Sequence, residues 1–506
     1  MHPNAIVRIL RGCSRVVLLL ASAYYLAVVI VLAVLRIPYK FELERVEGSI
    51  VDQIARVLHG LPIFVEPSLE QIAYLYTPLY YYVSALASSI LGLGFTAPRL
   101  ITFASTLGCL GLSYLLVFRE TKSRVCAFVS VGLFSATFRI GGAWFDLARV
   151  DMLYVFLAFL GLFLTRVTRR PWGQAWAGVA FFLAFFTKQP AAFIAVAAAI
   201  YPASYLRGWA RISMLSTFCV LAIASTWLMD QLTGGWYWYY VVHLGSLHEM
   251  REGVLFQFWT RDLMGTMSIP CLLSCVVFWP RGTPEEKERA AFFGLWFLGA
   301  CAASWSARLH TGGYINTVIP AYLAVCVAGT LGLHRMSRYY FDGHDNLSVP
   351  SIRGHAVSVA VIGLLMAHFV ASYYNPLTQL PSRDDERGGE KLLRVIQSFP
   401  GEVYLADHGF LHTMAGKGTY AQGLTVWDIL RADGDIQQGR LATEIREALA
   451  LRRFDAIILD DEQWFEELDL DRHYRLAGRV FAPEEAHVFY PVTGGHTRPD
   501  YLFVPR

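Results

Sequence analysis

Apolar runs of membrane-crossing length recur along the first 375 residues of the chain and are absent from the rest. A helix needs roughly 20 predominantly apolar residues to cross a bilayer. The runs lie near 16–35, 98–117, 125–142, 147–165, 174–191, 191–206, 212–233, 258–279, 290–307, 313–333 and 355–374. This pattern predicts a polytopic α-helical membrane protein with about 11 transmembrane helices.

The segment between the first two runs has a different pattern. Residues 47–60 place Ile50 and Ile54 on one helical face, which predicts an amphipathic helix that ends at Gly60. Residues 78–93 are mostly apolar but number only 16. Whether this stretch spans the membrane decides the orientation of every later span. The charge pattern of the later loops favours a position along the outer interface, which makes it a juxtamembrane segment of the first outer loop.

The composition supports a membrane protein and divides the chain in two. Hydrophobic residues make up 55% of the chain and charged residues 16%, whereas a soluble domain is about 25% charged. Residues 1–375 hold 28 Lys and Arg against 18 Asp and Glu, a net charge of +10, and residues 376–506 hold 15 against 22, a net charge of −7. We therefore expect a transmembrane domain over 1–375 and a soluble domain over 376–506.

The basic residues determine the predicted orientation. If 78–93 does not span, the basic clusters of the later loops, such as Arg119–Arg124 and Arg166–Arg170, all fall on one side. Cytoplasmic loops carry an excess of Lys and Arg, so this side is the cytoplasm. The N-terminus is then cytoplasmic and the C-terminal domain extracytoplasmic, in a protein of the inner (plasma) membrane. Because the basic residues occupy span ends, they give no indication of nucleic-acid binding.

The C-terminal residues show the pattern of a small α/β domain. Strand-like runs alternate with a helical pattern. The strands are expected at 402–406, 455–460 and 501–505, and the helix at 440–453. Asp407 and His408 follow the first strand, where α/β folds often place ligands. An ordinary turn is the alternative for these two residues.

Charged residues on the predicted outer face need an explanation, because charges near the membrane interior face a cavity or a partner. Glu47 begins the amphipathic helix, where the helix dipole keeps a carboxylate ionised, and an ionised carboxylate can act as a general base toward a hydroxyl. Asp146 and Arg149 lie three residues apart, so on a helix they share a face and can pair. The alternatives are a simple helix-start residue for Glu47 and an interfacial ion cluster for the other two.

Further polar residues follow on the same face. Asp151 lies about one turn inside the next predicted span. Lys188 ends an apolar run and either lines a cavity or only extends to the interface. Arg308 and His310 begin a turn that contains Gly312, where the chain can approach a ligand closely. An Arg in such a turn suits a phosphate, because its guanidinium binds oxyanions in a bidentate manner.

Taken in order, these features resemble the GT-C superfamily of membrane glycosyltransferases, and most closely its branch of protein O-mannosyltransferases and the lipid A aminoarabinose transferase. The likeness covers roughly residues 16–375. Its parts are an acidic residue in a long first outer loop, a short helix ending in Gly, an aromatic–Pro–Leu–aromatic stretch, an Arg at the second span and two later motifs. In this sequence they are Glu47, Gly60, Tyr76–Tyr81, Arg99, Ala148–Leu153 and Thr187–Pro190.

The resemblance implies a sugar donor carried on a polyprenyl phosphate, a membrane-lipid environment and transfer to an acceptor hydroxyl on the outer face. The first-loop carboxylate would activate the acceptor, basic residues of the outer loops would hold the donor phosphate, and a single displacement would invert the anomeric centre. The implied residues are Glu47, Asp146 and Asp151 for catalysis, Arg149, Lys188, Arg308 and His310 for the donor phosphate, and Glu44, Tyr76, Tyr80 and Tyr314 for substrate binding.

Several points stay open at the level of sequence. Members of this group often carry Asp-Glu where this chain has Val46 and Glu47, which makes Glu44 a second candidate for the base. No residue cluster suggests a metal site, and the resemblance leaves a divalent metal open as cofactor. The acceptor is a glycan, a lipid or a protein.

Two other classes of function are alternatives. A polyprenyl-phosphate or lipid transporter (a flippase) also needs intramembrane charges, but should show repeats or broken helices in matching halves. A non-catalytic membrane assembly protein would not need the clustered cations on the outer face.

Overall fold

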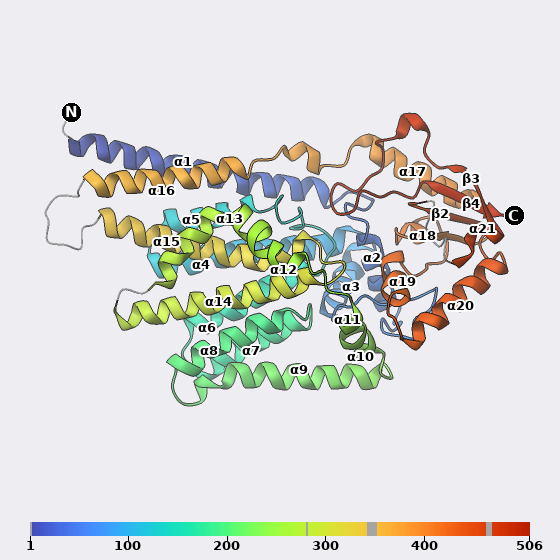
Figure 1. The fold of residues 1–506 in the computed structure, drawn as a ribbon, viewed down its shortest axis with the longest axis horizontal. Coiled ribbons are helices and arrows are strands. Elements are labelled where there is room, and N and C mark those ends of the chain that lie inside the picture. Colours follow the sequence, from blue (N-terminus) through green and yellow to red (C-terminus); the bar gives the residue numbers. More distant parts are fainter. Residues whose placement is uncertain (1–2, 280–281, 342–351, 462–467) are drawn as a thin grey trace.

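Helices make up most of the chain and form an elongated bundle with a small sheet at one end (Figure 1). The computed structural model describes residues 3–279, 282–341, 352–461 and 468–506. The first helix begins at the end of the bundle far from the sheet, and the C-terminus lies in the sheet (Figure 1). The long helices of the bundle are α1 (Pro3–Arg36), α4 (Thr96–Thr121), α5 (Arg124–Ala136), α6 (Asp151–Val167), α7 (Pro171–Phe185), α8 (Ala191–Tyr205), α9 (Ser213–Leu232), α13 (Thr266–Phe278), α14 (Pro284–Leu309), α15 (Ile319–Phe341) and α16 (Ile352–Ala371).

Six helical stretches of the described residues are long and apolar enough to cross a membrane, or seven if one bent pair counts as a span. Helices α5, α7 and α8 have only 13, 15 and 15 residues. At 1.5 Å per residue they are shorter than a hydrocarbon core of roughly 30 Å. A helical chain with several membrane-crossing helices is therefore confirmed, whereas the count of about 11 spans stays a prediction.

The connection between α5 and α6 is longer than the sequence predicts. Helix α5 ends at Ala136 and α6 begins at Asp151, although the apolar runs extend to 142 and resume at 147. Gly142 and Ala143 have positive φ angles of 88° and 60°, which a right-handed helix does not contain. Residues 137–150 therefore form a loop, and this loop contacts the first outer loop.

The first outer loop contains two short helices, as the sequence predicts. Helix α2 (Glu47–Leu58) buries Ile50 and Ile54 completely, and Gly60 follows it at a φ of 70°. Helix α3 (Leu79–Leu91) packs on α2 and α4. The side chains of Leu86 and Ile90 on α3 are 69% and 80% exposed. Such an exposed apolar face is what the predicted position at the membrane interface requires.

The end of the chain forms a four-stranded sheet in the order β1-β2-β4-β3. Strands β1 and β2 are parallel, and β4 is antiparallel to both β2 and β3. The elements here are α17 (Arg383–Ser398), β1 (Val403–Leu405), α18 (Leu411–Met414), α19 (Gly423–Leu430), α20 (Ile436–Ala450), β2 (Ala456–Leu459), α21 (Leu470–His473), β3 (Tyr474–Arg479) and β4 (Tyr501–Pro505). Three strands and α20 lie where the sequence predicts. Strand β3 was not predicted, because it is an edge strand in which only Tyr474 is buried.

Side chains alternate across this sheet, as a strand covered on both faces requires. Val403 and Leu405 pack in one apolar cluster with residues of α17, and Tyr404 packs on the opposite face with residues of α19 and α20. Phe41 of the first outer loop belongs to the α17 cluster and contacts the ring of Phe489 edge-on at 5.4 Å. The first outer loop and the sheet therefore share a core.

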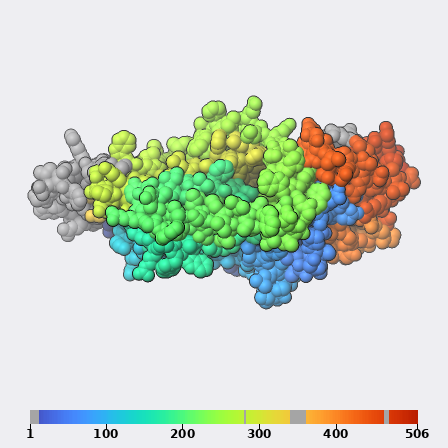
Figure 2. Space-filling view, turned by 90° about the horizontal axis from the view of Figure 1, so that it is seen from below, coloured from blue at the N-terminus to red at the C-terminus, as the bar shows by residue number. Residues whose placement is uncertain are grey.

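A backbone-to-backbone contact joins α2 to the turn after β1. A Cβ atom on Gly48 would lie 2.1 Å from the carbonyl oxygen of Gly409, so only glycine permits this approach. Figure 2 shows the orange and red C-terminal residues directly against the blue residues of the first part of the chain. The contact fixes the first outer loop between the bundle and the sheet.

Candidate functional site

Glu47, the first residue of α2, forms a fully buried ion pair with Arg99 of α4. Arg99 Nη2 lies 2.6 Å from Glu47 Oε2, and Arg99 Nε lies 2.9 Å from Oε1. The backbone N–H groups of Leu43 and Ala148 donate to the same carboxylate at 2.7 and 2.6 Å. Burial alone would raise the pKa of Glu47, but Arg99 and these hydrogen bonds hold it below its ordinary value.

This pair joins three segments of the chain. Arg99 also donates to the carbonyl oxygens of Arg36, Tyr39 and Phe41. A carboxylate has about four lone-pair sites, and each oxygen of Glu47 already accepts two hydrogen bonds. The pair therefore fixes the first outer loop against α4 and the 137–150 loop, and it leaves no Glu47 lone pair for a substrate.

Glu44, three residues earlier, pairs with Arg149. Arg149 Nη1 lies 3.2 Å from Glu44 Oε2, and Nη2 donates to the Tyr76 hydroxyl at 3.3 Å. The guanidinium lies 4.7 Å above the ring of Trp144. Glu44 Oε2 also accepts from the Val46 N–H, whereas Oε1 accepts no hydrogen bond from the residues that the structure describes. Burial raises the pKa of Glu44.

Lys188, just after α7, pairs with Asp151 at the start of α6. The Lys188 ammonium lies 2.7 Å from Asp151 Oδ1, and both side chains are buried. It also lies 5.2 Å from the ring centre of Tyr76 and 5.6 Å from that of Tyr154. Lys188 therefore faces the interior of the protein, and the alternative of a side chain that only extends to the interface is wrong.

Tyr76 connects the two pairs into one group, which we call the junction cluster. It consists of Glu44, Tyr76, Arg149, Asp151 and Lys188. Its two cations balance its two carboxylates. Among the described residues, Arg149 Nε is buried without a hydrogen-bond partner, and Lys188 has three N–H donors of which Asp151 takes one. The cluster therefore retains N–H donors that its own ion pairs do not use.

Neighbouring elements hold the junction cluster in place. The hydroxyl of Thr102 on α4 donates to the carbonyl oxygen of Arg149 at 3.2 Å. On the other side, the Thr493 N–H donates to the Leu43 carbonyl at 3.2 Å, and a Cβ on Gly494 would lie 2.7 Å from Glu44 Cγ. The C-terminal part of the chain therefore forms one wall around Glu44.

Asp146 does not pair with Arg149, contrary to the sequence prediction. It pairs with Arg36 at the end of α1, at 3.2 Å and fully buried. The prediction was wrong because residues 137–150 are not helical, so a spacing of three does not place two side chains on one face. The Arg36–Asp146 pair lies next to the Glu47–Arg99 pair, since Arg99 donates to the Arg36 carbonyl.

Tyr80 lies inside the packing between α3 and α4. It is completely buried. Its hydroxyl bonds to the Pro98 carbonyl at 2.9 Å and to the Thr102 hydroxyl at 3.0 Å. These contacts indicate that Tyr80 stabilises the packing of α3 on α4, and Tyr80 is not a member of the junction cluster.

The turn after α14 approaches the junction cluster through one aromatic contact. Tyr314 stacks on Trp144 with ring centres 5.8 Å apart, and Trp144 in turn lies under Arg149. Arg308 is directed elsewhere: its Nε lies 2.9 Å from Asp262 Oδ2. His310 pairs through its backbone with Met250. Within the described part of the chain, neither Arg308 nor His310 touches the cluster.

The sequence analysis missed two residues that shape the site. Trp144, which supports Arg149, lies between two predicted spans, where an aromatic side chain ordinarily marks the membrane interface. Arg36 lies at the end of the first span, where a cation ordinarily marks the interface. The signal that could have drawn attention to Arg36 is that an arginine needs a charged partner once it is buried, and Trp144 carries no such signal.

A second buried cluster connects the first outer loop to the sheet. His408 Nδ1 lies 2.5 Å from Glu42 Oε2, and Nε2 lies 3.0 Å from Asp460 Oδ2. Burial raises the pKa of Glu42 to about 8. Burial would lower the pKa of His408, but Asp460 and Glu42 raise it well above its ordinary value. The His408 ring is therefore held by two carboxylates of the protein itself.

Among the residues that the structure describes, no group of three His, Cys, Asp or Glu side chains could hold a metal ion. We therefore assign no residue to a metal.

Known structures share this fold. ArnT from Cupriavidus metallidurans, in a crystal structure bound to undecaprenyl phosphate, matches with a TM-score of 0.59 and 14% identity, over 96% of this chain and 97% of that chain. The apo structure of the same ArnT also gives 0.59 and 14%, over 95% and 97%. The oligosaccharyltransferase of Archaeoglobus fulgidus, in its apo form, gives 0.51 and 12%, over 90% of this chain and 73% of that chain. No family model and no curated protein matches the chain.

These matches show the fold of the protein. ArnT and the oligosaccharyltransferase are GT-C glycosyltransferases. The chain has the GT-C fold over nearly its whole length. The sequence motifs predicted this fold for residues 16–375, and the structural match extends it to the sheet. Among the described residues, the junction cluster is one of the groups of buried charges that retain an unused donor, since Arg149 Nε has no hydrogen-bond partner.

Proposed function

We propose that the protein is a glycosyltransferase that moves a sugar from a polyprenyl-phosphate donor to an acceptor hydroxyl at the junction cluster. The observation that carries this proposal is a buried pair of cations, Arg149 and Lys188, beside the first-loop carboxylate of Glu44 in a GT-C fold. The ArnT with the same fold holds undecaprenyl phosphate in its crystal structure. That ligand supports a polyprenyl phosphate as the donor carrier here.

Arg149 and Lys188 bind the donor phosphate in this proposal. The phosphate gains negative charge as it leaves, and fixed cations in a site shielded from water stabilise that charge strongly. Arg149 offers its unused Nε–H, and Lys188 offers two N–H donors beyond the one that Asp151 takes. Asp151 is then a positioning residue that holds the ammonium in place.

Glu44 is the general base that we propose, in place of Glu47. Four hydrogen bonds saturate Glu47 and its pKa is lowered, which makes it a weak base. Glu44 retains a free Oε1, and burial raises its pKa. A raised pKa favours proton transfer from a hydroxyl to the carboxylate. Asp146 forms an ion pair with Arg36, and we assign it a structural role.

The proposed reaction is a single displacement. The acceptor oxygen attacks the anomeric carbon from the side opposite the phosphate, and its proton passes to Glu44 Oε1. The new carbon–oxygen bond forms as the bond to the phosphate oxygen breaks, and that electron pair leaves with the polyprenyl phosphate. Attack from the opposite side inverts the anomeric centre.

Two aromatic side chains flank the proposed sugar position. Tyr76 contacts both cations, and Tyr314 stacks on the Trp144 ring that supports Arg149. Flat rings can pack on a sugar ring while their hydroxyls bind its edge. Arg308 and His310 shape the turn that carries Tyr314, since Arg308 donates to the Gly313 carbonyl.

The experiment that tests this function uses the purified full chain with a panel of polyprenyl-phosphate sugars. Release of polyprenyl phosphate is measured for the wild type and for Glu44→Gln. The proposal expects release from at least one donor, and a loss of roughly 10²-fold or more in Glu44→Gln. Binding of no donor at all, with a folded protein, would contradict it. Release that is unchanged in Glu44→Gln would remove Glu44 as the base.

A further inference from the structure

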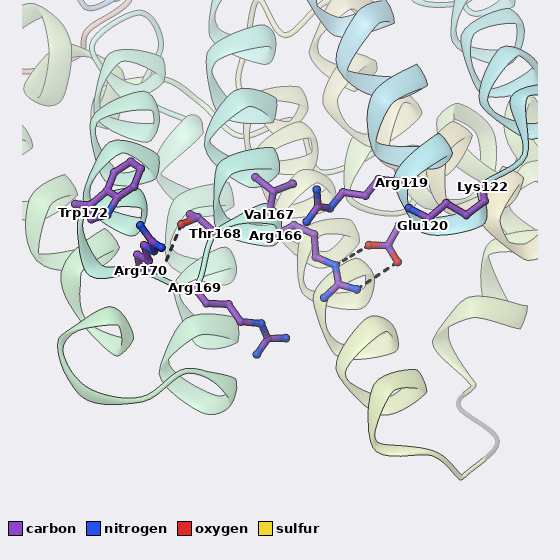
Figure 3. A pocket seen from close by; sticks show the side chains of 9 residues that line it. All are labelled: Arg119, Glu120, Lys122, Arg166, Val167, Thr168, Arg169, Arg170 and Trp172. Atoms are coloured by element: carbon purple, nitrogen blue, oxygen red, sulfur yellow. Dashed lines mark hydrogen bonds and ion pairs between the residues drawn. The ribbon is translucent and has the colours of Figure 1, made fainter.

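A cavity of about 760 Å³ opens at the end of the bundle opposite the sheet. It lies between the end of α4 and the turn from α6 to α7 (Figure 3). Five of the nine residues that line it are cationic, against a single carboxylate. A cavity of this size is in the range of roughly 300–1,000 Å³ that small-molecule sites occupy.

Two of these cations are already neutralised. Arg166 forms ion pairs with Glu120 at 2.8 Å and with Glu288 at 3.3 Å, and Arg169 lies 2.5 Å from Glu288. Figure 3 shows the bidentate contact between Arg166 and Glu120 on the wall of the cavity. These pairs fix the wall and leave the other cations of the cavity to bind an outside group.

The remaining three cations stand around the cavity without such partners. Arg119, Lys122 and Arg170 are exposed, and none of them forms an ion pair with a residue that the structure describes. Figure 3 places Arg119 and Lys122 on one side of the cavity and Arg170 on the other. An anion bound between them would therefore contact cations on two sides.

Exposed apolar side chains lead from the cavity along the bundle. On α7, Trp172 lines the cavity and Trp176 follows one turn later, with 61% and 60% of their side chains exposed. On α4, Leu107 and Leu115 are 44% and 51% exposed and lie twelve and four residues before Arg119. Residues four apart share a helix face, so the exposed apolar side chain of Leu115 lies on the face of α4 that carries Arg119.

We propose that this cavity binds the phosphate head group of an anionic phospholipid, with its acyl chains along the exposed faces of α4 and α7. The three exposed cations recognise the phosphate, and basic pockets between helices bind lipid head groups in this manner. The exposed apolar side chains favour a lipid over a free anion, because only a lipid has acyl chains that can pack on them. The site lies at the opposite end of the bundle from the junction cluster and is independent of glycosyl transfer.

The general excess of cations at this end does not account for the arrangement. Lys and Arg residues at one end of the bundle orient the protein in the membrane at any position within that end. Orientation alone does not require three of these cations to surround a cavity beside a tryptophan. Arg207, Arg211 and Lys287 are exposed cations of helix ends on the same side, outside the cavity. They provide a control with the same loss of charge.

The test measures lipid binding to the purified full chain in detergent by native mass spectrometry. The probes are dioleoylphosphatidylglycerol, dioleoylphosphatidylcholine and inorganic phosphate. The site variant is Arg119→Gln with Lys122→Gln and Arg170→Gln, and the control variant is Arg207→Gln with Arg211→Gln and Lys287→Gln. Thermal melting without lipid establishes that both variants are folded, and single substitutions replace the triple variant if it is not.

The proposal expects the wild type to prefer phosphatidylglycerol over phosphatidylcholine, and the site variant to bind phosphatidylglycerol at least roughly tenfold more weakly. The control variant should retain the wild-type affinity. Equal weakening in both variants would overturn the proposal, because net charge alone would then explain the binding. Inorganic phosphate that competes at the same concentration as the lipid would also overturn it, since the site would then be one for a free anion.

Discussion

Two glutamates of the first outer loop, only three residues apart, have opposite environments. Glu47 accepts four hydrogen bonds and pairs with Arg99, whereas Glu44 retains one free oxygen beside Arg149. A buried carboxylate that is fully bonded stabilises the structure, and one with an unused lone pair can accept a proton. The difference between these residues decides which carboxylate can take part in chemistry.

Glu44→Gln and Glu47→Gln should therefore fail in different ways. Glu44→Gln should lose roughly 10²-fold or more in transfer rate. Its melting temperature should fall less than that of Glu47→Gln, because Glu44 accepts two hydrogen bonds and Glu47 accepts four. Glu47→Gln leaves the Arg99 charge buried without its partner, which costs about 3–5 kcal/mol. Transfer rate and thermal melting are measured on the same preparations.

The reverse pattern would contradict this assignment. If Glu47→Gln remained as stable as the wild type and lost all transfer, Glu47 would be the base that the sequence motif suggested. Asp52→Asn on the same helix provides a control for the loss of a carboxylate in α2, since Asp52 contacts the Phe410 N–H and no residue of the junction cluster.

Arg149→Gln should weaken donor binding by roughly tenfold or more, since a hydrogen bond to a charged group contributes about 1.5–3 kcal/mol. Arg308→Gln is the matched change, because the Arg308 charge is paired with Asp262 outside the cluster. Binding of polyprenyl phosphate to both variants is measured by calorimetry. Equal affinities of the two variants would show that Arg149 does not hold the phosphate.

The sequence predicted the types of site residue better than their partners. The motifs contain Arg149 and Lys188, and both lie in the junction cluster. The partner of Arg149 could not be predicted, because Glu44 lies 105 residues away in the chain. The spacing of Asp146 and Arg149 suggested a helical pair, and the positive φ angles at Gly142 and Ala143 belong to a loop instead. Pairing across such distances depends on tertiary packing, which local pattern does not contain.

At the scale of elements, helix α2 lies between the bundle and the sheet and contacts both. Glu47 at its start is fixed to α4, and Gly48 touches Gly409 after β1. The nearby contact of His408 with Glu42 and Asp460 adds buried charge to the same interface. The sheet therefore contacts the loop that carries Glu44 at several points.

The His408 contact makes this interface sensitive to pH. The pKa of Glu42 is raised to about 8 and that of His408 is raised above its ordinary value of 6.5, so both hold protons more tightly in the folded state. Stability then falls as the pH rises, because the folded state binds more protons than the unfolded chain. The contribution of His408 is complete below pH 6.5 and is lost as the pH rises through its folded-state pKa.

We expect the melting temperature of the wild type to fall more steeply above pH 6.5 than that of His408→Gln. His59→Gln, an exposed histidine just after α2, is the control and should follow the wild type. Melting curves at a series of pH values provide the comparison. Parallel curves for wild type and His408→Gln would contradict the coupling.

The elements themselves were largely predictable, and the exceptions have physical reasons. Strong hydrophobic periodicity places α2, α20 and three strands close to their observed positions. Strand β3 escapes prediction because it is an exposed edge with a bulge between Leu476 and Gly478. The end of α5 was misplaced because apolar residues continue past it into a buried loop.

At the scale of the whole molecule, the two ends of the bundle have different chemistry. One end carries the junction cluster beneath the sheet, and the other carries the basic cavity of α4, α6 and α7. The positive-inside rule predicts that the cavity faces the cytoplasm and the sheet faces outside. In that orientation the proposed donor site lies at the outer face of the membrane.

Cysteine labelling tests this orientation. The C-terminal residues 376–506 contain no cysteine, and Leu451 is 81% exposed. In a chain with Cys13 and Cys275 replaced by Ser, Leu451→Cys should react with a membrane-impermeant maleimide in intact cells. Lys122→Cys at the other end should react only after permeabilisation. The opposite pattern would reverse the predicted topology.

The most direct test of the central claim is an experimental structure of the full chain with polyprenyl phosphate bound. We expect the phosphate within hydrogen-bonding distance of Arg149 Nε and Lys188 Nζ, with Glu44 Oε1 facing the position from which the acceptor oxygen attacks. A phosphate bound away from both cations, for instance beside Arg308 and His310, would contradict the proposed site.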